Sequence, residues 1–330
     1  MKSDHPLETS NARVSPCRNL MRDAHGRSLH KLRVQLTDAC QYRCFYCMPE
    51  NATFLPASQL LPAKGLIEIC RNLVDCGVDE IRLTGGEPLL RKEFRDIVSG
   101  LSELPLKKLG LTTNGQRLKE QLRFLRQTKC RSLNISLDSL RADRFRNITK
   151  RGELMIVREA VEMAALLGFE VKVNTVVFRG INDDELLDFV NFSKCLNIEV
   201  RFLEYMNIGP MYQKNRAYFI SADEMRSRIE QSEKLSQIDV PKDSTSISYR
   251  SSSGAQIGFI ASESKPFCSN CSRLRLTAKG QLRACLMSVD GKSLLGQKLE
   301  AYPGLLKSVM ELKPFTRLEN INQPMYQIGG

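Results

Sequence analysis

Two groups of three cysteines have the spacing of metal ligands, although they lie far apart in the chain. We call them the first triad and the second triad, and they are Cys40, Cys44, Cys47 and Cys268, Cys271, Cys285. Three thiolates hold three irons of a [4Fe–4S] cluster and leave the fourth iron open, whereas structural clusters and zinc sites normally use four protein ligands. Iron–sulfur ligation is therefore favoured for both triads. Zinc is the alternative, and it competes more strongly at the second triad, where Asp290 or another carboxylate would complete four ligands.

The remaining cysteines and the histidines suggest no further metal site. The chain has 11 cysteines, and an odd, clustered count argues against a disulfide framework. Three of the other cysteines, Cys70, Cys76 and Cys195, fall on apolar helix faces, where we expect core packing. All three histidines lie near the N-terminus, so a histidine-based catalytic triad is not expected.

The sequence alternates short apolar stretches with longer stretches of helical spacing, and these predict the strands and helices that position the triads. Strands are expected at Leu32–Thr37, Glu80–Thr84, Lys108–Thr113, Ser132–Leu137, Glu170–Val177 and Ile198–Glu204. Helices are expected at Leu66–Cys76, Phe94–Leu104, Glu153–Leu167 and Asp183–Cys195. This alternation predicts an α/β fold with a parallel sheet, a partial (β/α)6 barrel of the TIM type. Its active site would lie at the carboxyl ends of the strands, where the first triad follows the first strand.

The composition changes after this region. Lys242–Gly254 is rich in serine and poor in large apolar residues, and is expected to be a loop or linker. A hairpin is expected from Arg273–Thr277 and Gln281–Met287. We therefore divide the chain into a disordered arm at 1–20, the partial barrel at 21–240, and a C-terminal domain at 241–330 that carries the second triad and ends in Gly-Gly.

Strand alternation also predicts a basic barrel interior. The side chains opposite the apolar faces are Arg33, Arg82, Lys172 and Arg201, and the hairpin adds Arg273 and Arg275. Burying unpaired charges is costly, so a counter-charge must be present. A polyanionic ligand such as a triphosphate is the simpler source, because arginine forks suit phosphate oxygens. The alternative is pairing with Glu87, Asp138 and Glu204.

Composition narrows the class of protein. The formal net charge is +12, with 42% hydrophobic and 26% charged residues, as in a soluble globular protein with an anionic partner. No stretch is long and apolar enough to span a membrane, and the polar first 20 residues do not resemble a signal peptide. A cytoplasmic location is expected. No basic run with interleaved aromatic residues predicts nucleic-acid binding.

The motifs resemble a known superfamily. The first triad, C-x3-C-x2-C with Tyr46 before its last cysteine, resembles the signature of the radical S-adenosylmethionine (radical SAM) superfamily. The string Gly85-Gly86-Glu87-Pro88 is similar to the superfamily's element that binds the methionine amino group of the cofactor. From Asp23 to the terminal Gly-Gly, the chain resembles one family of this superfamily, the GTP 3′,8-cyclases of molybdenum-cofactor biosynthesis.

The resemblance implies roles for individual residues. The first triad would hold the cluster that binds and cleaves S-adenosylmethionine, and the second would hold an auxiliary [4Fe–4S] cluster whose open iron binds guanine. The implied contacts to S-adenosylmethionine are Tyr46, Gly85, Gly86, Glu87, Ser136 and Met206. The implied GTP-binding residues are Arg33, Arg82, Thr113, Lys172, Arg201, Arg273 and Arg275. The implied catalytic residues are Arg273, Arg275, Gly329 and Gly330, the glycines forming a tail that reaches the active site.

The resemblance also implies the reaction, that of a lyase. A 5′-deoxyadenosyl radical would remove the ribose 3′ hydrogen of GTP, and the product would be (8S)-3′,8-cyclo-7,8-dihydroguanosine 5′-triphosphate, in the first step of molybdenum-cofactor biosynthesis. Implied partners are an electron donor such as flavodoxin or ferredoxin and the downstream cyclic pyranopterin monophosphate synthase. Nucleic acid and membranes are not expected as partners, and the protein would be a monomer or homodimer.

Some positions depart from the family pattern. Glu80 stands where a basic residue is common, which is expected to weaken a phosphate contact, and Gln35 replaces a small hydroxyl residue. Residues 295–323 match poorly, so weaker tail docking is expected. The alternatives are a radical SAM enzyme acting on a peptide, a zinc-binding regulator that recognises nucleic acid, and a family member that keeps its clusters but not turnover.

Overall fold

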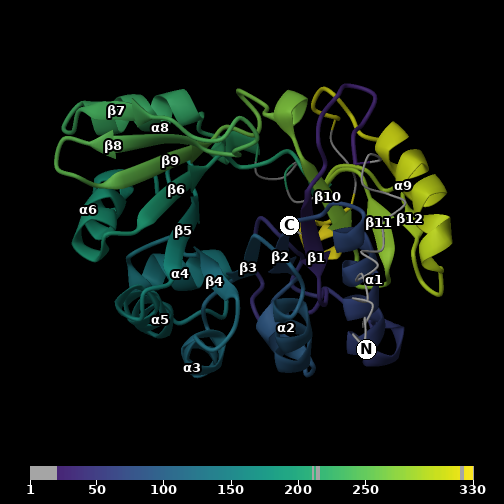
Figure 1. Ribbon diagram of the computed structural model, residues 1–330. Coiled ribbons are helices and arrows are strands. Elements are labelled where there is room, and N and C mark those ends of the chain that lie inside the picture. The colour runs from purple at the N-terminus through teal and green to yellow at the C-terminus, as the bar shows by residue number, and fades with distance from the viewer. Residues whose placement is uncertain (1–20, 210–211, 213–215, 320–322, 330) are drawn as a thin grey trace, which may run out of the picture.

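One curved sheet organises the molecule. The computed structural model describes residues 21–209, 212, 216–319 and 323–329. The arm predicted at 1–20 lies outside these residues. The strands are β1 (Lys31–Gln35), β2 (Glu80–Thr84), β3 (Lys108–Thr113), β4 (Cys130–Ser136), β5 (Glu170–Val176), β6 (Glu199–Leu203), β7 (Leu235–Ile238), β8 (Ile247–Ser251), β9 (Gln256–Ile260), β10 (Arg273–Leu276), β11 (Gln281–Arg283) and β12 (Lys292–Ser293). They form a single twelve-stranded sheet in the order β12-β11-β10-β1-β2-β3-β4-β5-β6-β9-β8-β7 (Figure 1).

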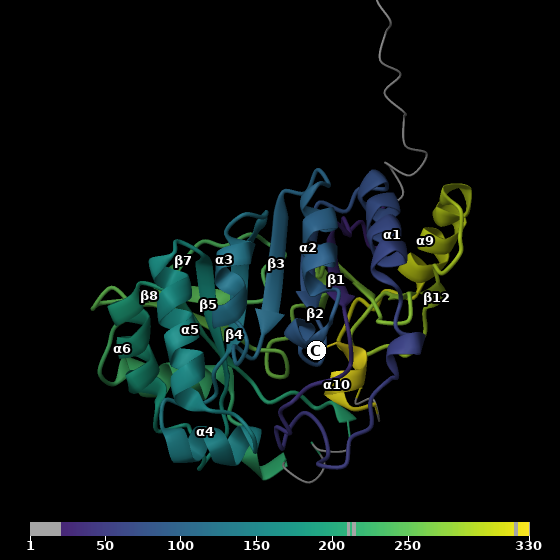
Figure 2. The same ribbon diagram turned by 90° about the horizontal axis from the view of Figure 1, so that it is seen from below.

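The centre of this sheet is the predicted partial barrel. Strands β1 to β6 are neighbours in chain order, and each pairs in parallel with the next. The helices are α1 (Ala63–Asp75), α2 (Phe94–Ser102), α3 (Leu122–Leu125), α4 (Ala142–Thr149), α5 (Leu154–Leu166), α6 (Leu186–Leu196), α8 (Ala222–Glu230), α9 (Tyr302–Glu311) and α10 (Met325–Ile328). Figure 2 shows α1, α2, α3 and α5 side by side along one face of the sheet. The six expected strands and four expected helices are confirmed, with bounds shifted by a few residues.

The hydrophobic core fills the space between these helices and the sheet. Helix α5 buries Leu154, Val157, Ala160, Val161 and Ala164, the three- and four-residue spacing of one helix face. The strands contribute alternate residues to the same core, as in the regular alternation of β5. Cys70 and Cys76 are buried as predicted, but Cys195 is exposed, because the buried face of α6 passes through Phe192 and Ser193 instead.

The C-terminal third of the chain extends the sheet at both edges. The predicted linker Lys242–Gly254 is wrong, since it contains β8, which pairs antiparallel with β7 and β9. In turn β9 pairs in parallel with β6. The domain boundary at residue 240 stays a prediction and falls between β7 and β8.

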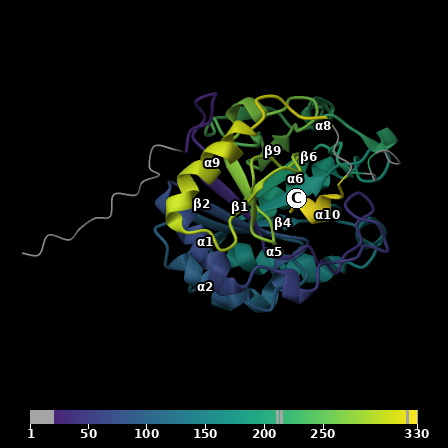
Figure 3. The same cartoon turned by 90° about the vertical axis from the view of Figure 1, so that its right-hand side faces the viewer.

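The predicted hairpin extends the sheet at its other edge, beyond β1, where β12 is the outermost strand. Strand β10 pairs antiparallel with β11 and in parallel with β1. Because β10 follows the first two cysteines of the second triad and β1 precedes the first triad, this pairing brings the two triads to one region of the sheet. Figure 3 shows α10, close to the C-terminus, within the ring formed by the other elements.

None of the helices in the described part of the chain combines the length and apolar character that crossing a bilayer requires.

Candidate active site between two cysteine triads

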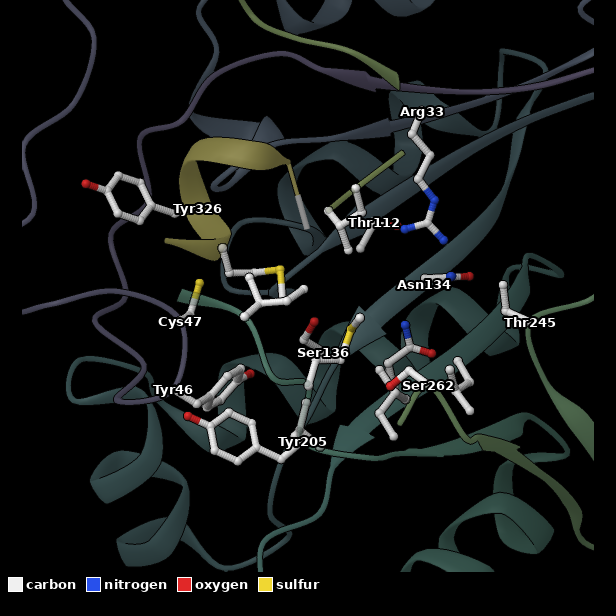
Figure 4. Close-up of a pocket in the computed structure, with 18 of the residues that line it drawn as sticks. Arg33, Tyr46, Cys47, Thr112, Asn134, Ser136, Tyr205, Thr245, Ser262 and Tyr326 are labelled. Atoms are coloured by element: carbon white, nitrogen blue, oxygen red, sulfur yellow. The ribbon is translucent and has the colours of Figure 1, made fainter. Parts of the chain in front are cut away.

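A cavity of about 330 Å³ lies at the carboxyl ends of the parallel strands, and both cysteine triads line it. Its size falls in the range of small-molecule sites. Of the predicted site residues, it is also lined by Arg33, Tyr46, Gly85, Gly86, Thr113, Ser136, Arg201, Met206, Arg273 and Arg275. Figure 4 shows Arg33 and Cys47 on different sides of this space, with Ser136 between them. The side chains of Glu87, Arg82 and Lys172 do not line this cavity.

The cysteines fit a cluster better than a single ion. In neither triad do the three sulfur atoms all lie within 4.8 Å of one another, among the residues that the structure describes. A tetrahedral zinc site with Zn–S bonds of about 2.3 Å would hold its sulfurs about 3.8 Å apart. Asp290, the predicted fourth zinc ligand, is exposed and does not line the cavity. The wider spacing and the open side of each triad suit a four-iron cluster.

Backbone contacts fix the loop that carries the first triad. The amide of Gly86 donates to the carbonyl of Thr37 (2.7 Å), and the amide of Glu87 donates to that of Ala39 (2.7 Å). A Cβ atom at position 86 would lie 2.3 Å from the carbonyl oxygen of Asp38. Glycine is therefore required at this position, because two backbone segments meet there without room for a side chain.

Glu87 holds a neighbouring loop instead of facing the cavity. Its carboxylate is fully buried and accepts hydrogen bonds from the Thr113 hydroxyl (2.8 Å) and from the amides of Asn114 (2.7 Å) and Leu89 (3.0 Å). Burial outweighs these donors and raises the pKa of Glu87 to about 7. Asn114 in turn directs its side-chain amide at the Cys40 sulfur (3.7 Å). Glu87 thus acts on the first triad through the loop that begins at Thr113.

Tyr46 and Asp138 form a buried pair on the side of the first triad. The Tyr46 hydroxyl donates to Asp138 (2.8 Å), and the Val176 amide donates to the other carboxylate oxygen (2.9 Å). Burial raises the pKa of Asp138 to about 6 and that of Tyr46 well above its usual range. The Tyr46 ring also packs against Phe178, with ring centroids 5.2 Å apart. It packs against Tyr205 as well, at 6.4 Å, and Figure 4 shows these two tyrosines next to each other. These contacts hold Tyr46 rigidly beside the cysteines.

The two triads differ in charge environment. Burial raises the pKa of all three thiols of the first triad, to about 11 for Cys40 and about 12 for Cys47. At Cys271 burial also opposes ionisation, but the Arg273 guanidinium and the Lys313 ammonium lower the pKa of this thiol to about 6. The positive field is therefore strongest at Cys271, whereas burial and the neighbouring cysteines raise the pKa of Cys268.

Arginines stand side by side across four strands, and two of them, Arg33 and Arg275, line the cavity. In the sheet register Arg33 of β1 lies opposite both Arg82 of β2 and Arg275 of β10, and Arg275 lies opposite Arg283 of β11. We call these four residues the arginine row. Burial, followed by the charges of Arg275 and Arg273, lowers the pKa of Arg33 well below its usual range. Like charges directly opposite one another destabilise a sheet, so this row favours an anion.

Three of the predicted cations have protein partners. Lys172 and Arg201 both form ion pairs with Glu199, at 2.9 Å and 2.7 Å. Arg82 donates to the Leu111 carbonyl (3.2 Å) and the Ser132 hydroxyl (3.1 Å), outside the cavity.

The carboxylates proposed as alternative partners are engaged elsewhere. Glu204 accepts hydrogen bonds from Ala222 and Glu263, just as Glu87 and Asp138 accept theirs from hydroxyl and amide donors. The pairing alternative is therefore wrong for these three carboxylates, although Glu199 plays that part for Lys172 and Arg201.

Four cavity residues escaped the sequence analysis. The side-chain oxygens of Thr112, Asn134, Asn174 and Ser262 are buried and have no hydrogen-bond partner among the described residues. Buried polar atoms are normally satisfied, so these four oxygens mark where a ligand would bind. Strand alternation could have identified two of them, because Asn134 lies opposite Lys172 and Asn174 lies opposite Arg201 in the register.

The C-terminal tail docks at the arginine row. The Gly329 carbonyl accepts a hydrogen bond from Arg275 (2.6 Å), and Gly329 caps α10 with a φ of 71°. Gln35 donates to the Tyr326 carbonyl (3.1 Å). The side chain of Gln35 thus reaches the tail backbone, and the expectation of weaker tail docking stays a prediction. Gly330 lies outside the described residues.

Family models match most of the chain. Residues 34–193 match the radical SAM superfamily, and residues 198–312 match the family described as Molybdenum Cofactor Synthesis C. A GTP 3′,8-cyclase from Synechocystis sp. is 43% identical over 315 residues, which is 96% of each chain. Another from Aquifex aeolicus is 38% identical over 83% of this chain and 87% of its own, and one from Clostridium botulinum is 35% identical over 94% of this chain and all of its own.

Solved structures confirm the fold. SuiB of Streptococcus suis, bound to its precursor peptide SuiA, superimposes with a TM-score of 0.64 over 87% of this chain and 68% of its own, at 13% sequence identity. At this identity the likeness shows the fold alone. The full-length sequence similarity to the curated relatives, together with the two family models, shows that this chain belongs to the GTP 3′,8-cyclase family of the radical SAM superfamily.

Proposed function

We propose that this protein is a radical SAM GTP 3′,8-cyclase, which converts GTP to (8S)-3′,8-cyclo-7,8-dihydroguanosine 5′-triphosphate. The observation that carries the proposal is the placement of Arg33 and Arg275, two members of the arginine row, on a cavity lined by both cysteine triads. A nucleoside triphosphate has a polyanionic end for the arginines and a base for an open iron, so one molecule suits both features.

The residues divide into three roles in this proposal. The first triad holds a [4Fe–4S] cluster and S-adenosylmethionine, which when bound supply the 5′-deoxyadenosyl radical that removes the ribose 3′ hydrogen. Gly85, Gly86, Ser136 and Met206 line the cavity, and Asp138 holds the Tyr46 hydroxyl. Glu87 is a positioning residue, since it orders the Thr113–Asn114 loop without lining the cavity.

The second triad and the cations place the substrate. Arg33 and Arg275 bind the triphosphate, and Arg273 lies between it and Cys271, whose sulfur it contacts at 3.4 Å. The oxygens of Asn134 and Asn174 accept hydrogen bonds from ribose hydroxyl groups. The Gly329 carbonyl, held by Arg275, brings the tail to the same place. Rigid positioning of the ribose against the radical source is the largest contribution that such side chains make to a radical reaction.

The proposal also covers partners. Reductive cleavage of S-adenosylmethionine consumes an electron, so a one-electron donor such as flavodoxin or ferredoxin supplies it. The product passes to cyclic pyranopterin monophosphate synthase. The protein acts as a cytoplasmic monomer or homodimer, and nucleic acid is not a partner.

Anaerobic incubation of the reconstituted, reduced protein with S-adenosylmethionine, with and without GTP, tests the proposal. We expect GTP-dependent formation of 5′-deoxyadenosine together with a cyclised guanosine triphosphate, separated by chromatography and identified by mass spectrometry. Formation of 5′-deoxyadenosine with unchanged GTP would favour the peptide-modifying alternative. Absence of both products from protein that carries its iron would indicate a member without turnover.

A further inference from the structure

A buried lysine from the poorly matching C-terminal region reaches the second triad. Lys313 follows α9 and is 5% exposed. Its ammonium donates to the Cys271 sulfur (3.2 Å), to the Ala284 carbonyl (2.7 Å) and to the Arg273 carbonyl. These three acceptors use all three donors of a lysine ammonium, so the side chain has one defined position.

A second layer of contacts fixes the backbone that carries Lys313. The Arg27 guanidinium donates to the carbonyls of Lys313 (3.3 Å), Pro314 (2.9 Å) and Cys268 (2.5 Å). Arg27 is itself held by Asp23 at 2.5 Å. One arginine therefore ties the segment at 313–314 to the first cysteine of the second triad.

The charge of Lys313 has no carboxylate partner at ion-pair distance among the described residues. The charged groups that act on it most are the sulfurs of Cys271 and Cys285, followed by Arg273. A buried ammonium that forms no ion pair with a carboxylate is unfavourable. The negative charge that balances the Lys313 ammonium is that of the Cys271 thiolate and of a cluster bound to this thiolate.

We propose that Lys313 is a positioning residue for the auxiliary cluster and raises the reduction potential of that cluster through its positive charge and its N–H···S hydrogen bond. This inference rests on the proposed function, which places a [4Fe–4S] cluster on the second triad. One-electron reduction makes a cluster more negative by one charge. A fixed positive charge in contact with a ligand sulfur stabilises the reduced form, as do hydrogen bonds to cluster sulfurs.

Lys313→Met tests the proposal, because methionine keeps most of the side-chain length and removes both the charge and the donors. The matched control is Lys307→Met, since Lys307 is an exposed residue of α9. Both changes are made in a chain whose first triad is replaced by alanine, so that any iron and any electron paramagnetic resonance signal belong to the second triad. Iron and sulfide are counted, and the midpoint potential is measured by potentiometry with dithionite as reductant.

We expect Lys313→Met to retain one cluster whose midpoint potential is more negative than that of the background chain, and Lys307→Met to leave the potential unchanged. An unchanged potential in Lys313→Met would overturn the proposal. If that variant loses its iron, Lys313→Gln replaces it, and an unchanged potential there overturns the proposal equally. Loss of iron in both neutral variants, with retention in Lys313→Arg, would assign Lys313 to holding the cluster and not to setting its potential. A background chain with no iron at its second triad would instead contradict the proposed function.

Discussion

Gln35 offers a direct test of how the C-terminal tail is held. This side chain is 4% exposed and makes two hydrogen bonds. Its Nε2 donates to the Tyr326 carbonyl (3.1 Å), and its Oε1 accepts from the Ala278 amide (3.2 Å). Helix α10 has only four residues, which is too short for a helix to be stable by itself. Its docked position therefore depends on such contacts.

The magnitude follows from these two bonds. A net hydrogen bond contributes about 1 kcal/mol, and a buried amide left without an acceptor costs about 1–3 kcal/mol. Gln35→Ala removes both bonds and is expected to lower the free energy of unfolding by about 2–4 kcal/mol. Gln35→Glu keeps an acceptor for the Ala278 amide but places an oxygen against the Tyr326 carbonyl, so its effect falls on the tail. A tail contact weakened by about 1–2 kcal/mol raises the population of the undocked tail roughly 5- to 30-fold.

Hydrogen exchange measured by mass spectrometry on peptides that cover α10 is the appropriate assay. The amides of Gln327 and Gly329, which bond within this helix, should exchange roughly 5- to 30-fold faster in Gln35→Glu than in the unchanged chain. Gln297→Ala, a change at an exposed glutamine, serves as the control. Unchanged exchange of α10 in Gln35→Glu would refute the reasoning and confine Gln35 to supporting the turn at Ala278.

Three further predictions follow from the site. Arg33→Met removes a buried charge from a row of like charges, so it should stabilise the ligand-free chain by about 1–2 kcal/mol in chemical denaturation. The same change should weaken GTP binding at least tenfold in calorimetry. Equal or lower stability of the variant would contradict the account of the arginine row. Gly86→Ala should cost the first triad its iron, since the new Cβ would lie 2.3 Å from a backbone oxygen, whereas Gly304→Ala, with open space around it, should retain full iron content. Burial raises the pKa of Glu87 to about 7 from an ordinary 4.5, despite the opposing charge of Arg117. Between these two pH values the folded chain therefore binds one more proton than the unfolded chain. The free energy of unfolding should fall by about 3 kcal/mol as the pH rises from about 4.5 to 7. Glu87→Gln should remove that slope in the iron-free protein, and a slope that persists would assign it to other groups.

The local part of the fold could be predicted because its signals are local. The expected bounds of β2 and β3 match the observed ones, and each is a run of alternating residues beside a helix with regular apolar spacing. Consecutive strands of such units pair in parallel, so the order of the central sheet followed from the chain order.

Strand β8 escaped prediction because serines interrupt its short apolar alternation. Ser248 and Ser251 are buried, and their hydroxyl groups find partners in Ser246 and Ser253. Ser248 and Ser251 lie on opposite faces of the strand, so the only apolar alternation left is Ile247 and Tyr249, of which Tyr249 packs in the core. So short a signal among serines looks like the composition of a loop. Pairing with β9, which is apolar, stabilises it.

Several site residues could not be predicted because their partners are remote in sequence. Gln35 meets the Tyr326 carbonyl across 291 positions, and Lys313 meets Cys271 across 42 positions. No spacing rule connects such residues, because segments remote in the chain meet only in the folded structure. The motifs predicted which residues gather at the strand ends, but not which of them hold one another.

The cations of the site fall into two sets, those that form ion pairs with carboxylates and those that face other arginines, and this difference determines which ligand the cavity favours. Glu199 and Arg201 stand two residues apart on one face of β6, and Lys172 pairs with both Glu199 and Glu170, so the chain supplies its own counter-charges on this side. On the opposite side, Arg33 faces other arginines across two strands. A neutral ligand, or one with a single negative charge, would leave most of that repulsion in place. The free energy released on binding is therefore largest for a compact polyanion, which is why the row selects a triphosphate over a peptide of ordinary charge.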